Sequence, residues 1–192
     1  MQRDELERTT AIYTHLRGAL AIPAGLLFVL AALGNWQVGP FRHHWVFIAG
    51  VLATGGAYQL IARAYRRHYG RATPSGEQQL RSAAAVVIAV VVVFGGSLLL
   101  RSRAGFSLDL PVNAIAATFA LVMLASYAIG RVLRPHHAAV YGTLLVAGAL
   151  PVWHGEDPSN VGLVMCGAAV IAGGLLDHLV FVHLFSAPAL DG

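Results

Sequence analysis

The feature that most constrains the fold of this chain is a set of six long runs without Asp, Glu, Lys or Arg. They lie between Arg17 and Asp177 and last 24, 20, 19, 21, 21 and 19 residues. A helix needs about 20 mostly apolar residues to cross the roughly 30 Å hydrocarbon core of a bilayer. Each run is long enough, and a soluble domain of this size has no use for six of them. The sequence therefore predicts an all-α membrane protein with six transmembrane helices.

The composition fits a single membrane domain. Hydrophobic residues make up 57% of the chain and charged residues 11%, whereas soluble proteins average about 25% charged residues. The loops and termini leave no segment for a separate soluble domain, so we expect one six-helix domain over residues 1–192 with short cytoplasmic termini. The only cysteine, Cys166, lies inside the last run. We expect it to be a small packing residue, since no disulfide can form within the chain.

The positions of the arginines predict the orientation in the membrane. We place the helices near residues 17–35, 45–62, 82–100, 111–130, 138–153 and 161–183. Ten of the thirteen arginines then fall on one side, which the positive-inside rule assigns to the cytoplasm, and all three tryptophans fall at the opposite boundary. We therefore expect a multi-pass protein of the plasma (inner) membrane, with its N- and C-termini in the cytoplasm.

A basic segment follows the second predicted helix. It contains Arg63, Arg66, Arg67 and Arg71, at the start of the longest predicted cytoplasmic loop. The simplest interpretation is ordinary positive-inside topology, but such a cluster can also hold anionic lipid or an acidic partner. We do not expect nucleic-acid binding, because one short loop against a membrane offers few phosphate contacts.

The second, fourth and sixth predicted helices begin alike. Each follows a proline that stands two residues before a polar residue, in Pro40-Phe41-Arg42, Pro111-Val112-Asn113 and Pro158-Ser159-Asn160. Thirteen residues after the polar residue comes a small one, namely Gly55, Ser126 or Gly173, and four residues later Gln59, Gly130 or Asp177. This pattern predicts three pseudo-repeated hairpins, about 15–72, 79–134 and 135–184, around a pseudo-threefold axis.

Small residues line one face of the even-numbered helices. They are Gly55 and Gly56, after Ala49 and Ala53, in the second helix, and Cys166, Ala169, Gly173 and Gly174 in the sixth. Small side chains let helices approach closely in lipid. We expect these faces to meet one another in the centre of the bundle.

Few polar residues lie inside the predicted helices. Asp177 is the only acidic one, and it is either a functional group or one half of a salt bridge with Arg17, Arg81 or Arg131. His178 follows it, but adjacent helical residues point about 100° apart and do not make an oriented dyad. If a polar pathway exists, we expect Gln59, Asn113, Ser126 and Asp177 to line it.

The nine histidines mostly lie at the edges of the predicted helices, with His43 and His44 outside and His136 and His137 inside. Haem ligation needs imidazoles that face each other at matching depth, and no His-Glu-x-x-His motif is present. We therefore expect no cofactor and no metal. The open alternative is weak divalent binding by the outer histidines His43, His44 and His154 together with Glu156 and Asp157. No motif of a hydrolase or a phosphate-binding loop occurs either, so we do not expect an enzyme.

Two stretches resemble the HdeD-like acid-resistance membrane proteins: Gly25-Leu26-Leu27 through Gly56, and Gly148 through Pro158 to Gly167 and Gly174. The resemblance implies a membrane role in stress tolerance and carries no functional residue. We therefore expect a non-enzymatic membrane protein with a structural or regulatory role in acid or envelope stress, acting with a membrane-protein partner or as a homo-oligomer. Two alternatives are a small channel or transporter for an ion or small solute, and an accessory subunit of a larger membrane complex.

Overall fold

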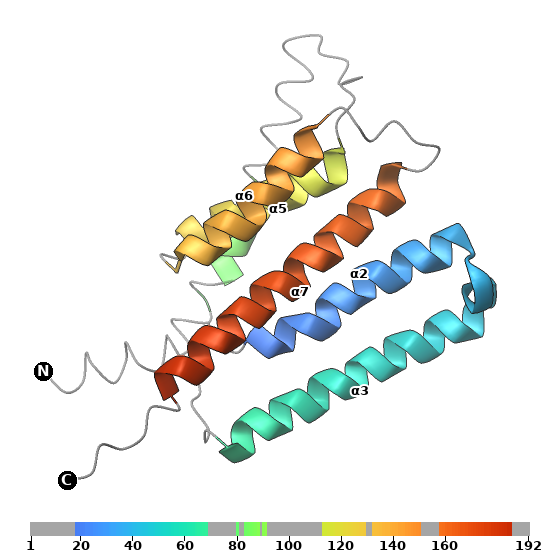
Figure 1. Ribbon diagram of the computed structural model, residues 1–192, viewed down its shortest axis with the longest axis horizontal. Helices are drawn as coiled ribbons and strands as arrows, with labels where there is room; N and C mark the ends of the chain where they lie inside the picture. Colours follow the sequence, from blue (N-terminus) through green and yellow to red (C-terminus); the bar gives the residue numbers. More distant parts are fainter. Residues whose placement is uncertain are drawn as a thin grey trace, which may run out of the picture.

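The fold is all-helical in the part of the chain that the structure describes (Figure 1). The computed structural model describes residues 18–68, 80, 83–88, 90–91, 113–129, 132–150 and 158–185. The helices are η1 (Gly18–Leu20), α2 (Ala21–Trp36), η2 (Gly39–Arg42), α3 (His44–His68), α5 (Ala114–Ile129), α6 (Pro135–Ala149) and α7 (Pro158–Phe185). The predicted all-α class is thus confirmed for these residues.

Three of these helices are long and apolar enough to cross a membrane, judged by length and composition. They are the segments Gly18–Trp36, His44–Arg67 and Ser159–His183. Helices α5 and α6 have 16 and 15 residues. At 1.5 Å per residue they are about 24 and 22 Å long, less than the thickness of the hydrocarbon core. The predicted span at 82–100 falls largely outside the described residues.

Helix α3 continues past its predicted end at residue 62 and reaches His68. The prediction that the first arginines belong to a loop is therefore wrong: Arg63, Arg66 and Arg67 lie on the last turns of α3 and are exposed. No Gly or Pro occurs between Gly56 and Gly70, and Arg and Ala are good helix formers. The spacing of three and four places the three arginines on one face, while Arg71 lies outside the described residues.

Helix α6 begins at Pro135, three residues before its predicted start. Proline suits the first position of a helix because its φ is already helical and its missing N–H is not needed there. This earlier start brings His136 and His137 into the first turn of α6.

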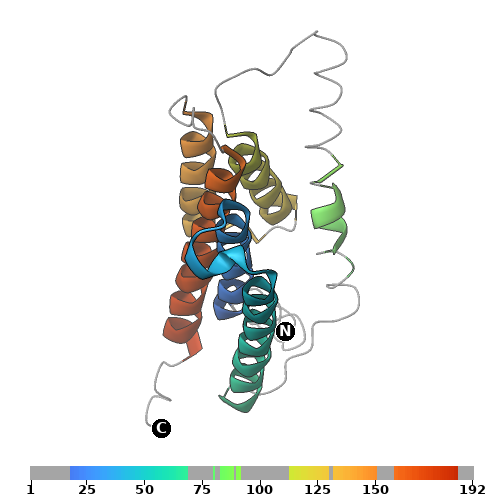
Figure 2. The same ribbon diagram turned by 90° about the vertical axis from the view of Figure 1, so that its right-hand side faces the viewer.

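Helix α7 is central among the described helices. In Figure 1, α3, α2 and α7 lie in that order, and α5 and α6 lie on the other side of α7. The turned view separates α5 from α6 (Figure 2). Helix α2 therefore separates α3 from most of α7, and α7 joins the α2–α3 hairpin to the α5–α6 pair.

Glycines bring α7 into backbone contact with α2 and with the short helix η1 that leads into it. A Cβ added to Gly167 would lie 2.6 Å from the carbonyl oxygen of Gly25, and one added to Gly174 would lie 2.5 Å from that of Gly18. Conversely, a Cβ on Gly25 would lie 2.7 Å from the Gly167 oxygen. Both pairs are seven residues apart, about two helical turns, so they fall on one face of each helix. The two antiparallel helices therefore pack more closely than any side chain would allow.

This packing differs from the expectation that the small faces of α3 and α7 meet. A Cβ on Gly55 or Gly56 would have no described atom within 4 Å, and Ala49 and Ala53 are exposed. The expectation is wrong for these helices because η1 and α2, not α3, present glycines at the spacing of Gly167 and Gly174. Most of the first predicted helix of the middle unit, at 82–100, lies outside the described residues, so the threefold repeat stays a prediction.

The opposite side of α7 packs against α5 and α6. Cys166 and Ala169 are buried there, in a cluster with Ala116 and Ala120 of α5 and Tyr141 and Leu144 of α6. Gly173 faces the Tyr141 ring, because an added Cβ would lie 3.2 Å from its hydroxyl oxygen. The small residues of α7 thus form two faces, one packed against η1 and α2 and the other against α5 and α6.

Candidate functional site

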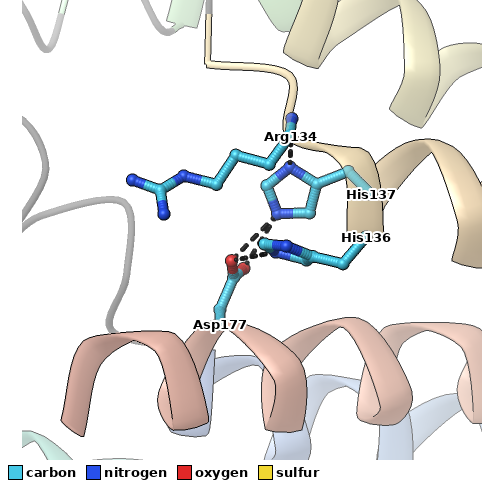
Figure 3. Close-up of polar contacts among 4 residues, drawn as sticks. All are labelled: Arg134, His136, His137 and Asp177. Carbon is cyan, nitrogen blue, oxygen red and sulfur yellow. Dashed lines mark hydrogen bonds and ion pairs between the residues drawn. The ribbon is translucent and has the colours of Figure 1, made fainter. Parts of the chain in front are cut away.

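The carboxylate of Asp177 is the meeting point of two histidines from the first turn of α6 (Figure 3). His136 Nε2 lies 2.8 Å from Asp177 Oδ1, and His137 Nε2 lies 2.9 Å from the same oxygen and 3.1 Å from Oδ2. The side chains of His137 and Asp177 are 4% and 9% exposed, and that of His136 is 18% exposed. We call these three residues the His–Asp cluster; it fastens the start of α6 to α7.

The backbone at the start of α6 fixes the ring of His137. Arg134 is the N-cap residue, and its N–H donates a hydrogen bond of 3.3 Å to His137 Nδ1. Since Nδ1 accepts, the proton of a neutral ring is on Nε2, from which it is donated to Asp177. The two contacts of His137 therefore agree on one tautomer.

Helix α5 covers the cluster with an aromatic ring. Tyr127 stacks on His137 with ring centroids 4.1 Å apart and planes at 12°. Tyr141 of α6 lies next to it, with its ring centroid 5.7 Å from that of Tyr127. The His–Asp cluster is thus assembled from α6 and α7 and held on one side by α5.

His178 points away from the His–Asp cluster. Its Nδ1 is 2.6 Å from the Tyr65 hydroxyl on α3, and Tyr65 also packs edge-to-face on Phe181 of α7. Asp177 and His178 thus contact different helices, which confirms that they do not form a dyad. Asp177 thus connects α7 to α6 by hydrogen bonds, and His178 connects α7 to α3.

Replacing Tyr65 with phenylalanine is expected to lower the free energy of unfolding by about 1 kcal/mol, because the ring packing is kept and the hydrogen bond to His178 is lost. Thermal unfolding in detergent micelles measures the loss. Tyr58→Phe on the same helix is the matched control, since Tyr58 is 44% exposed. Equal melting temperatures for both variants would show that the hydroxyl of Tyr65 contributes nothing.

The other polar candidates do not converge on Asp177. Gln59 is exposed on α3, and the Ser126 hydroxyl donates to the Met123 carbonyl 2.8 Å away within α5. Asn113 is buried at the start of α5, where its Oδ1 accepts the Ala116 N–H at 3.1 Å and caps the helix. The expectation that these residues line one pathway with Asp177 is therefore not met in this structure.

Sequence reasoning missed the partners of Asp177. It proposed Arg17, Arg81 or Arg131, all of which lie outside the described residues, and it placed the two histidines and Asp177 at the same edge without joining them. The sequence did offer one signal for the contact, namely that the two histidines and Asp177 were expected at the same membrane edge. Since α6 and α7 are consecutive and antiparallel, residues at the same edge lie at the same depth. What the sequence did not show was the rotation of α6 that turns both imidazoles toward α7.

The His–Asp cluster is also the arrangement in the described residues that most resembles a metal site. One potential ligand atom from each residue lies within 4.8 Å of the others. The sequence led us to expect no metal because it contains no ligand motif of fixed spacing. The metal site that the sequence left open is not tested by this structure. His43 and His44 are exposed at the end of η2 and the start of α3, and His154, Glu156 and Asp157 lie outside the described residues.

These features define the class of protein: a helical bundle with three helices long and apolar enough to span a membrane, and a largely buried cluster of two histidines and an aspartate. No protein-family model matches the chain, and comparisons with curated proteins and with solved structures also give no match. The resemblance to the HdeD-like proteins therefore stays a prediction, and function has to be argued from the geometry.

Proposed function

We propose that this chain is a non-enzymatic multi-pass protein of the plasma membrane with a structural or regulatory role. The observation that carries the proposal is the closed contact between α2 and α7, where the backbone at Gly25 and Gly167 leaves no room even for a methyl group. A conduit through these helices would need polar space at that place. The close contact favours a packed scaffold over a channel or transporter.

The surroundings of the polar residues support the same conclusion. Asn113 is used for capping and Asp177 for fastening α6. Two cavities of about 480 and 420 Å³ in the described part of the chain have almost entirely apolar linings, which suit lipid chains better than ions. Neither cavity is lined by Asp177.

We further propose six membrane-spanning helices with both termini in the cytoplasm. Trp36 and Trp45 lie at the α2–α3 turn together with Arg42, whereas Arg63, Arg66 and Arg67 lie at the far end of α3. Tryptophan favours the interface, and arginine is enriched on the cytoplasmic side. On this topology the exposed face of the three arginines lies against the cytoplasmic leaflet, where anionic lipid is the expected partner.

Flux measurements on proteoliposomes test the scaffold proposal against transport. We expect vesicles with the purified protein to lose a trapped pH gradient no faster than vesicles without protein. Gramicidin added to the same vesicles is the positive control for proton flux. Rapid flux that Asp177→Asn abolishes would overturn the scaffold role and establish a pathway through Asp177. The same comparison with a panel of trapped ions and small solutes extends the test beyond protons.

The physiological role that we propose is tolerance of acid or envelope stress, together with a membrane-protein partner or a second copy of the chain. This part rests on the resemblance to the HdeD-like proteins. Cells that lack the gene are expected to survive acid or envelope stress less well than complemented cells. Equal survival of the two strains under both stresses would contradict the stress role. The scaffold proposal would then still be tested by the flux measurements.

A further inference from the structure

We propose that His136, His137 and Asp177 bind a transition-metal ion such as Zn²⁺, which joins the first turn of α6 to α7. Two imidazoles and one carboxylate form a ligand set that suits Zn²⁺, Ni²⁺ or Cu²⁺, whereas Mg²⁺ and Ca²⁺ prefer oxygen ligands. The site does not depend on the proposed scaffold role, because metal binding to the purified chain is measurable without knowledge of its function.

The distances fit a small displacement around an ion. Tetrahedral Zn²⁺ holds its ligand atoms about 2 Å from the metal, and therefore about 3.3 Å from one another. The two Nε2 atoms lie 2.8 and 2.9 Å from Asp177 Oδ1. An opening of a few tenths of an ångström thus brings both nitrogen–oxygen distances to that value, and all three ligand atoms already lie within 4.8 Å of one another.

The convergence of neighbouring histidines is the unusual feature of the cluster. Side chains at successive positions of a helix start about 100° apart, yet both Nε2 atoms reach the same carboxylate oxygen. One histidine would be enough for a hydrogen bond between the helices. The two imidazoles of α6 and the carboxylate of α7 provide three of the four ligand positions of a tetrahedral site. The fourth position remains for water or a further ligand.

The surroundings hold the ligands and leave a route of entry. Tyr127 stacks on the ring of His137, which is nearly buried, whereas His136 is partly exposed. Figure 3 shows the Arg134 side chain directed away from the two imidazoles. Within the described contacts the Arg134 guanidinium makes no ion pair with Asp177, so the carboxylate is available to a cation.

Binding requires a proton to leave Nε2 of both imidazoles, because His136 and His137 each face Asp177 Oδ1 through that atom. His137 also needs a rearrangement of its backbone contact. Its Nε2 must give up a proton to become a ligand, and a neutral ring then carries the proton on Nδ1. That atom now accepts the Arg134 N–H at 3.3 Å. This long contact has to open on binding, and the released N–H is one of those at a helix N-terminus that water can satisfy.

Cobalt substitution of the intact protein tests the site. After treatment with chelator, the full chain in detergent micelles is titrated with Co²⁺, whose visible spectrum distinguishes tetrahedral from octahedral coordination. We expect an intense tetrahedral spectrum that saturates at one ion per chain and disappears when Zn²⁺ is added. His136→Gln and His137→Gln are each expected to weaken binding by more than roughly tenfold. The matched controls His183→Gln and His44→Gln are expected to bind like the wild type, because both residues are exposed and lie outside the cluster.

A wild-type chain with only the octahedral Co²⁺ spectrum of the buffer would overturn the proposal. Unchanged binding by both cluster variants would also overturn it. Melting curves without metal show whether a variant folds. If His137→Gln does not fold, the partly exposed His136→Gln decides the outcome, and the wild-type spectrum is a test that needs no variant.

Discussion

Replacing Gly174 with leucine is expected to lower the free energy of unfolding by about 3 kcal/mol, at the upper end of the range for overpacking. Even a single Cβ at Gly174 would lie 2.5 Å from the Gly18 carbonyl oxygen and 3.0 Å from the Ala21 side chain. The contact is with backbone, which cannot rotate away as a long side chain does. Helices α2 and α7 must therefore separate. Unfolding in micelles by graded addition of a denaturing detergent measures the loss.

Gly56→Leu is the matched control for this prediction, because Gly56 corresponds to Gly174 in the repeat pattern of the sequence. A Cβ there would have no described atom within 4 Å, so we expect a change within about 0.5 kcal/mol. Equal losses at the two positions would contradict the asymmetric packing of α2 and α3 in this structure and would favour a threefold bundle in which both glycines are packed.

Replacing Asp177 with asparagine is expected to lower the free energy of unfolding by about 3 kcal/mol, measured in chelator so that metal has no part in it. The carboxylate accepts hydrogen bonds from both His136 and His137, and hydrogen bonds to a charged group contribute about 1.5 to 3 kcal/mol each. Asparagine keeps the size but carries only one acceptor oxygen. The buried ring of His137 then loses part of its pairing at Nε2.

A double-mutant cycle separates the contact from general damage to α7. We expect Asp177→Asn and His137→Gln together to cost about 1 to 3 kcal/mol less than the sum of the single changes, because both remove the same interaction. His183→Gln, on the exposed face of α7, should leave the free energy unchanged. Additive losses for Asp177 and His137 would show that the two residues do not interact in the folded protein.

The lengths of the helices followed from the sequence to different degrees. The uncharged runs predicted the ends of α5 and α7 within three residues and those of α2 within four, because a charge or a proline stands near each end. Helix α3 was underestimated, since Arg63 was read as the end of the apolar segment although arginine itself is a good helix former. Absence of charge predicts where a helix is apolar, and not how far it continues beyond that point.

The packing of the helices was predicted less well. Glycines were recognised as contact residues, but Gly55 and Gly56 were paired with α7, and the role of Gly18 and Gly25 was not seen. Many faces of apolar helices carry small residues, and a sequence does not say which of two such faces meet. The register between antiparallel helices depends on their relative rotation and shift, which only the packed structure fixes.

By itself the sequence determined that the chain is helical and apolar and that Asp177 is the only acidic residue within the predicted helices. It also determined that His178 points in another direction than Asp177. These conclusions depend only on composition and on the helical period. The tertiary structure decided that α2 is the close neighbour of α7 and that His136 and His137 are the partners of Asp177. The physical reason is that periodicity is local, whereas a partner depends on how two separate helices are turned toward each other. The candidate site exists only once α6 and α7 have packed.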